Sequence, residues 1–170
     1  ERLESPDPLV KMDSLFFSDE SSIVVRGSAE IDAPPEVCAA YDMAKLSSRE
    51  TKKQSTALAR AIKTENEHSF ILHYVKDFKV PTAKPREWVT RVVWRWSDEH
   101  TLMVVYNSVD HPGFPTTSKF TRASNSVLNV YEKLPEEAQG MTKVTWTQQV
   151  DMKLRIPKWL AKRGGANQLK

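Results

Sequence analysis

The segment "REWVTRVVWRW", residues 86–96, limits the possible folds of this chain more than any other stretch. One set of side chains, mostly large and apolar, occupies its even positions: Trp88, Thr90, Val92, Trp94 and Trp96. Glu87, Arg91 and Arg95 occupy odd positions between them. Successive side chains of a β-strand point to opposite faces. The segment is therefore predicted to be a strand with one apolar face and one mostly solvated face.

Residues 143–151 show the same alternation near the end of the chain. The apolar residues of this segment share one face: Val144, Trp146 and Val150. Gln148 is the polar exception on that face. Because an amide buried without a hydrogen-bonding partner costs roughly 1–3 kcal/mol, we expect Gln148 to bind a ligand's headgroup or hydroxyl. Tyr74 or Tyr106 is expected to take part in the same contact.

Strand patterns recur after residue 55, separated by short segments that contain Pro, Gly, Asp or Asn. The predicted strands cover residues 56–65, 68–75, 86–96, 101–109, 126–134 and 143–151. Residues 22–31 also alternate like a half-buried strand, and residues 32–46 are typical of a short amphipathic helix. The expected apolar face of that helix carries Val37, Ala40, Tyr41 and Ala44. This order predicts an α+β fold built around an antiparallel meander.

The 170 residues suffice for one domain with its own core. We expect residues 1–14, which include two prolines, to form a linker or a loosely docked arm, and residues 15–170 to form the domain. The single cysteine, Cys38, excludes an internal disulfide, and its apolar neighbours favour a buried thiol over a reactive one. No apolar run approaches the ~18–20 residues of a membrane span. The chain is expected to be cytoplasmic and monomeric.

A curved antiparallel sheet with only two predicted helices leaves a wide apolar face to cover. Either the large side chains fill that space as ordinary core, or a ligand does. Both interpretations stay open for the three tryptophans of this face. If a ligand binds, the expected lining residues are Tyr74, Trp88, Thr90, Val92, Trp94, Tyr106, Trp146 and Gln148.

The stretch "SVDHPGFP", residues 108–115, contains the Ser, Asp and His of a possible hydrolase site. On an extended strand, however, Ser108 and His111 point in opposite directions, and no Gly-x-Ser-x-Gly turn presents the serine. We therefore predict a loop stiffened by Pro112, with Phe114 at an apolar rim. His111 is expected to be a structural hydrogen-bonding residue rather than a ligand contact.

Neither a metal nor a nucleic acid is an expected partner. His68 and His73 are five residues apart on a predicted strand, hence on opposite faces, and no Cys, His and Asp spacing resembles a ligand set. Arg91 and Arg95 lie on the face opposite the tryptophans, whereas base stacking and phosphate contacts should share one groove. The net charge of +3 comes from interspersed charges of both signs, which is weak evidence for a nucleic-acid partner. No cofactor is expected.

Four segments in series resemble the START domain, the StAR-related lipid-transfer module, between about residues 22 and 162. An Arg, an acidic residue, an aromatic residue and Val open a central strand at residues 86–89, and a Ser-Val-x-His-Pro element follows at 108–112. A Val-Arg-Ala element is matched by residues 121–123, where Thr121 replaces the valine. The last strand ends at Asp151, and Pro-x-Trp-Leu follows at 157–160.

The resemblance implies a helix-grip fold, in which a curved antiparallel sheet grips a long C-terminal helix and one lipid lies in the tunnel between them. That helix is expected to continue beyond residue 170. The ligand is expected to be a phospholipid, a sterol or another hydrophobic molecule, bound without catalysis for transfer or sensing. Two departures stand out. "SSRETKKQ" lacks the family's Trp-Asp, and Tyr74 and Val92 replace the acid and arginine of sterol-binding members.

An enzyme of the helix-grip polyketide cyclase type is the alternative, although it would need an ionisable pair inside the cavity. The loop around His111, Pro112 and Phe114 is expected to edge the tunnel mouth and to gate it. Several residues of the terminal segment would contact a membrane there: Lys158, Trp159, Lys162 and Arg163. Each basic side chain contributes about 1 kcal/mol near an anionic surface. A solvated helix face is the other interpretation of these charges.

Overall fold

The computed structural model describes residues 2–3, 5, 7–16, 23–45, 57–78, 83–135 and 140–153. One helix and ten strands lie in these ranges. The elements are β1 (Arg2–Leu3), β2 (Lys11–Phe16), β3 (Ile23–Ile31), α1 (Pro35–Lys45), β4 (Ala57–Asn66), β5 (Ser69–Lys76), β6 (Arg86–Trp96), β7 (Thr101–Ser108), β8 (Thr121–Arg122), β9 (Ser124–Lys133) and β10 (Thr142–Asp151).

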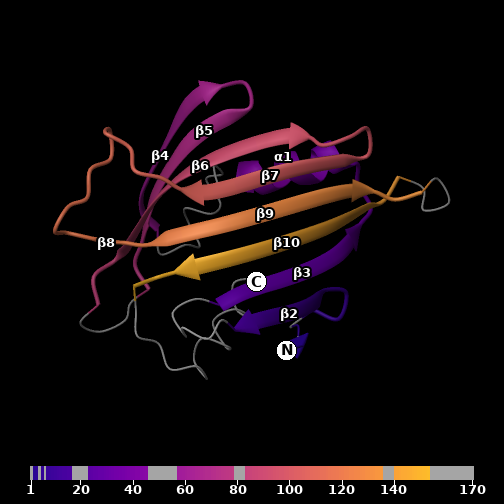
Figure 1. Ribbon diagram of the computed structural model, residues 1–170, viewed down its shortest axis with the longest axis horizontal. Helices are drawn as coiled ribbons and strands as arrows, with labels where there is room; N and C mark the ends of the chain where they lie inside the picture. The colour runs from indigo at the N-terminus through magenta and orange to yellow at the C-terminus, as the bar shows by residue number, and fades with distance from the viewer. Residues whose placement is uncertain are drawn as a thin grey trace.

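All the strands belong to one sheet, in the order β1-β2-β3-β10-β9-β7-β6-β5-β4, with β8 beside β6 (Figure 1). From β4 to β10 the neighbours along this path are neighbours in sequence apart from the short β8, so the predicted antiparallel meander is confirmed. The earlier strand β3 pairs antiparallel with β10, the last strand, and places Gly27 opposite Trp146. The α+β fold follows the expected order of elements.

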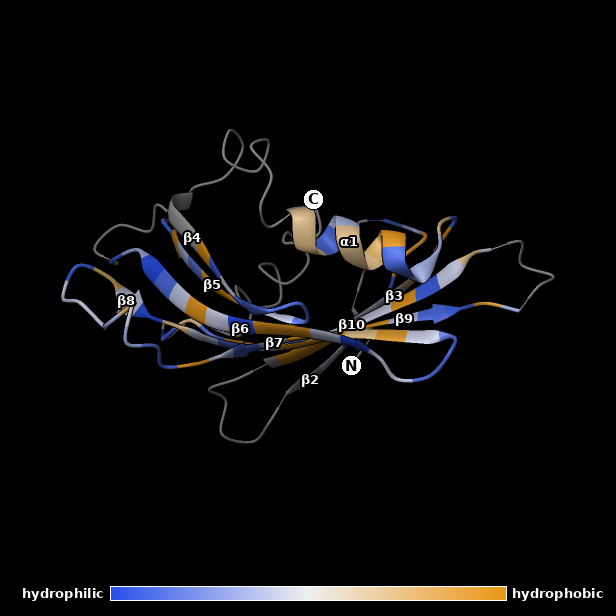
Figure 2. Ribbon diagram, turned by 90° about the horizontal axis from the view of Figure 1, so that it is seen from above, coloured by the Kyte–Doolittle hydropathy of each residue, from blue (hydrophilic) through white to orange (hydrophobic). Residues whose placement is uncertain are grey.

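Figure 2 shows the sheet edge-on, curved, with α1 on one side of it. The helix begins at Pro35, a residue that suits the first helical position because its missing N–H would have no partner there. The amides of Val37 and Cys38 donate to the carbonyl of Pro34 and close the first turn. The core cluster joins Cys38 and Ala39 of the helix to residues of β5, β6, β7 and β9, among them Leu72, Val92, Val104 and Tyr131.

The predicted apolar face of the helix is wrong. Val37 is 53% exposed and Tyr41 is 72% exposed, whereas Cys38 and Ala39 are buried. The helix is rotated relative to the expectation so that the small side chains pack on the sheet. This rotation also directs Asp42 toward the sheet, where two tyrosines and an asparagine donate to it.

We call the face of the sheet that packs on α1 the inner face and the opposite one the outer face. The outer face of the first half of β6 is not solvated as predicted, because Glu87 and Val89 are 3% and 1% exposed. The chain between β7 and β9 covers them. The amide of Val109 donates to the carbonyl of Val89, and the amide of Ala123 donates to the carbonyl of Glu87. β8 then pairs parallel with β6.

The start of the chain joins the sheet. β2 pairs with β3 along six residues, and Met12 and Ser14 are each only 2% exposed. The expected boundary after residue 14 therefore falls within a strand.

The expected C-terminal helix from residue 157 lies outside the described residues. No helix in the described part is long and apolar enough to cross a bilayer.

Candidate functional site

The eight predicted lining residues all lie on the inner face. The strand register sets Tyr74 beside Trp88, Val92 beside Tyr106, and Trp94 beside Val104. In the same way, Gln148 lies beside Val127 of β9, which lies beside Tyr106. The alternation of the sequence predicted this shared face because each strand keeps its period of two. Their role in ligand binding stays a prediction.

These residues differ in how far the protein itself covers them. Four are buried: Trp88, Thr90, Val92 and Tyr106. Thr90 donates its hydroxyl to Asn125 Oδ1 at 3.0 Å, so its polar group already has a partner. The other four are partly exposed: Tyr74, Trp94, Trp146 and Gln148. The partly exposed group therefore offers the surface on which a hydrophobic molecule could lie.

The rings of Tyr74 and Trp88 are stacked, with centroids 4.8 Å apart and an angle of 8° between their planes. Phe78 lies against Trp88 in an edge arrangement, with centroids 6.2 Å apart. Trp88 Nε1 is buried and has no hydrogen-bond acceptor in the described part of the protein. This end of the inner face is thus an aromatic layer.

Trp146 lies flat over Gly27, its partner on β3. A Cβ built on Gly27 would come within 1.8 Å of ring atom Cη2 of Trp146. Real Cβ atoms do not approach other heavy atoms this closely, so only glycine leaves room for the ring. The indole is held close to the backbone of the sheet, and Trp146 is partly exposed.

A polar cluster that the sequence analysis missed joins α1 to the sheet. Three uncharged donors converge on Asp42 Oδ2: Tyr106 Oη at 2.9 Å, Asn129 Nδ2 at 2.7 Å and Tyr131 Oη at 3.0 Å. We call these four residues the Asp42 cluster. Burial first, and then the charge of Asp42, raise the pKa values of both tyrosines, so both phenols stay protonated. The signal in the sequence was the alternation of Val127, Asn129 and Tyr131 on one face of a predicted strand.

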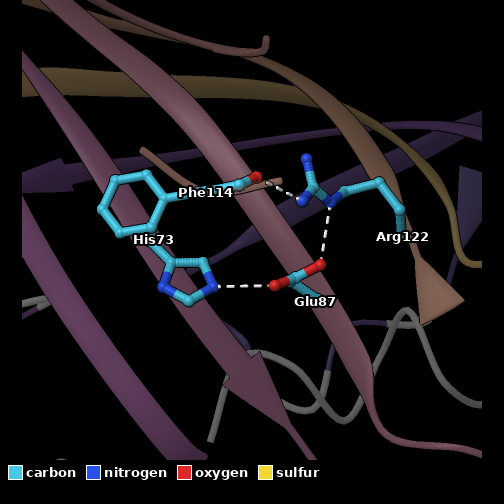
Figure 3. Close-up of polar contacts among 4 residues, drawn as sticks. All are labelled: His73, Glu87, Phe114 and Arg122. Carbon is cyan, nitrogen blue, oxygen red and sulfur yellow. Dashed lines mark hydrogen bonds and ion pairs between the residues drawn. The ribbon is translucent and has the colours of Figure 1, made fainter. Parts of the chain in front are cut away.

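Figure 3 shows a second polar cluster, which lies on the outer face. The Glu87 carboxylate, 4% exposed, contacts His73 Nε2 at 3.0 Å through Oε1 and accepts from Arg122 Nε at 3.0 Å through Oε2. Arg122 Nη2 donates to the carbonyl of Phe114 at 2.8 Å. The ring of Phe114 stacks on His73 with centroids 4.5 Å apart. These contacts hold the loop between β7 and β8 against the sheet.

The predicted gate residues divide into two groups. His111 Nδ1 accepts from the amide of Gly113 at 3.0 Å, a hydrogen bond within the loop, and its structural role stays a prediction. Pro112 is exposed, and Phe114 is stacked on His73 on the side of β5 opposite Tyr74. Membrane contact by Phe114 would therefore require its ring to leave that stack, and gating by this loop stays a prediction. The others lie outside the described residues: Lys158, Trp159, Lys162 and Arg163.

Cys38 is 8% exposed, as expected of a buried thiol, and its Sγ donates to the carbonyl of Ala33 at 3.7 Å. Burial is the main cause that raises the pKa of this thiol, so the protonated, unreactive thiol is favoured over the thiolate.

Within the described ranges, no group of His, Cys, Asp and Glu is arranged to hold a metal ion.

Comparison with known proteins agrees with this geometry. A family model described as the START domain matches residues 13–168. The chain belongs to the START domain family. No curated protein matches the sequence directly. The family assignment therefore depends on the family pattern as a whole and on the structure.

Solved START structures have the same fold. The human StarD13 (DLC2) lipid transfer and protein localization domain is 19% identical, with a TM-score of 0.75 over 98% of this chain and 81% of that one. Human StAR-related lipid transfer protein 5 is 15% identical, with a TM-score of 0.73 over 96% and 77% of the two chains. A fragment of the STAR-related lipid transfer protein from Xanthomonas axonopodis is 14% identical, with a TM-score of 0.71 over 96% of this chain and 89% of that one. At these identities the likeness establishes the helix-grip fold of this START domain.

Proposed function

We propose that this START domain binds one lipid or similar hydrophobic molecule against its inner face and does not alter it chemically. The observation that carries the proposal is the partial exposure of Tyr74, Trp94 and Trp146 on the face that also carries the core cluster. α1 packs over β7, β9 and β10. Partly exposed aromatic side chains gathered on one face of a curved sheet suit a ligand site lined by apolar residues.

The ionisable groups of the inner face favour binding over catalysis. Acid-base catalysis works best with groups whose pKa lies near the working pH. The pKa values of Tyr106 and Tyr131 are raised, chiefly by burial, and so lie further from neutrality than that of a free phenol. Their protons are also committed to Asp42. This arrangement suits a fixed polar wall better than the acid and base of a cyclase.

Native mass spectrometry of the purified domain, followed by lipid extraction, tests the proposal. We expect one ligand per chain, either carried through purification or taken up from vesicles of mixed phospholipids and sterol. A domain that stays ligand-free under both conditions, while its thermal unfolding shows that it is folded, would contradict the proposal.

Gln148 gives a first prediction about affinity. Its amide lies on the inner face and is partly exposed, so it can pair with a polar group of the ligand. Gln148→Leu is expected to weaken binding about three- to tenfold, the value of one hydrogen bond. The neighbouring Gln149→Leu is a matched control because that residue is exposed on the outer face. Affinity is measured by titrating delipidated protein with the ligand identified by extraction. Equal affinities for both variants would show that Gln148 does not contact the ligand.

A further inference from the structure

The Asp42 cluster carries a negative charge that a ligand on the inner face would meet. All three hydrogen bonds to Asp42 end on Oδ2, so Oδ1 receives none of them. Each donor is uncharged. Among the described residues, no Lys, Arg or His forms an ion pair with Asp42. The cluster therefore presents a carboxylate to the inner face with no cation to balance it.

Asn129 adds a second observation that points to a ligand. The orientation of its amide is fixed by chemistry, because Asp42 Oδ2 can only accept and therefore faces Nδ2, at 2.7 Å. Oδ1 of Asn129 is consequently an acceptor. This oxygen is buried, as is Asn129 as a whole, which is 8% exposed. No donor in the described part of the protein reaches it. Buried acceptors in folded proteins nearly always have a partner, whether protein, water or ligand.

The available groups of the cluster are thus acceptors. The hydroxyl protons of the two tyrosines are directed at Asp42 Oδ2, and Asn129 Nδ2 donates to Asp42 Oδ2 and, at 3.5 Å, to Tyr131 Oη. Asn129 Oδ1 has no donor among the described residues. A hydroxyl or an ammonium group can supply the missing donor. A phosphate or a carboxylate cannot, and its charge would be repelled by Asp42.

We propose that Asp42 and Asn129 form an acceptor site that selects a hydrophobic ligand ending in a hydrogen-bond donor, a hydroxyl or an ammonium, and rejects one ending in an anion. The proposal rests on the proposed function, since it names the polar end of the molecule bound on the inner face. It also explains why a charged residue, Asp42, sits on the side of α1 that packs on the sheet.

Four molecules with an unbranched chain of sixteen carbons test the selection: hexadecanol, hexadecylamine, hexadecyl methyl ether and hexadecanoate. Delipidated protein is incubated with neutral vesicles that contain all four in equal amounts, then separated and extracted. The amount of each molecule captured is divided by the amount left in the vesicles. The alcohol and the amine are expected to exceed the ether and the carboxylate about tenfold, the value of one hydrogen bond to a charged group.

Asp42→Asn tests the residue. The asparagine keeps one oxygen to accept from the three donors and puts an NH2 group where Oδ1 was, so the site would present a donor. The preference for alcohol and amine should disappear, and capture of hexadecanoate should rise. Glu36→Gln is the matched control, because it removes the same charge from an exposed position on the same helix.

Asn129→Leu gives an independent test if Asp42→Asn does not fold. It removes the unpaired acceptor and should reduce capture of the alcohol and amine about tenfold while leaving the ether unchanged. Equal capture of all four molecules by the wild-type domain, or an unchanged ranking in the folded variants, would overturn the acceptor site while leaving lipid binding intact. Capture of none of the four, together with no lipid in the purified protein, would instead contradict the proposed function itself.

Discussion

Glu87→Ala is expected to lower the free energy of unfolding by about 3–5 kcal/mol, because it removes one partner of a buried ion pair. The carboxylate is 4% exposed and is the acceptor for both His73 and Arg122. Its loss leaves the Arg122 guanidinium, 18% exposed, without a counter-charge. Since small domains are stable by only about 5–15 kcal/mol, much of the stability would be lost. Urea unfolding followed by circular dichroism measures the change.

The pair between Glu65 and Arg91 is a matched control. Glu65 also accepts from an arginine, with Arg91 Nε and Nη2 at 2.9 and 3.0 Å from its carboxylate, and it accepts from Ser69 Oγ at 2.7 Å. Arg91, however, is 48% exposed. Solvent screens such a pair. Glu65→Ala should therefore lower the free energy of unfolding much less than Glu87→Ala does. Equal losses for the two variants would show that burial does not govern the contribution of these pairs.

Gly27→Ala is expected to destabilise the domain by about 1–3 kcal/mol, the usual cost of adding a methyl group to a packed site. The new Cβ would lie 1.8 to 2.4 Å from three atoms of the Trp146 ring, so the ring or the strands must move. The same displacement should shift the tryptophan fluorescence of the folded protein. Urea unfolding gives the loss in stability.

A double-mutant cycle tests the cause of that loss. In a Trp146→Leu background the ring is absent, and Gly27→Ala should then lower the free energy of unfolding only slightly. If the alanine costs as much in this background as in the wild type, contact with Trp146 is not the reason that glycine occupies position 27.

The meander was predictable because its strands alternate over eight or more residues. β6 has the predicted bounds of 86–96, and β10 begins one residue before the predicted start. β1 and β8 are two residues long and have no period to detect. β2 carries Met12 and Ser14 on its buried side, and a serine there breaks the expected apolar pattern.

The alternation of side chains along the strands was enough to predict the residues of the inner face. It did not predict the hydrogen bonds of the Asp42 cluster. These hydrogen bonds join residues 87 and 89 positions apart, Asp42 with Asn129 and with Tyr131. Local sequence cannot show which polar residue of a helix meets which polar residue of a distant strand. The same limit explains the burial of Glu87, since a loop that begins more than twenty residues later covers it.

Photo-crosslinking is the sharpest test of ligand binding on the inner face, because it shows where the ligand lies. The delipidated domain is loaded from neutral vesicles with a long-chain alcohol that carries a diazirine in its chain, so that the bound molecule can be linked to nearby side chains by light. Crosslinks are expected on inner-face residues such as Tyr106, Trp146 and Gln148, in the alternating pattern of strands that present one face. Crosslinks confined to outer-face neighbours such as Val105 and Gln149 would contradict binding on the inner face.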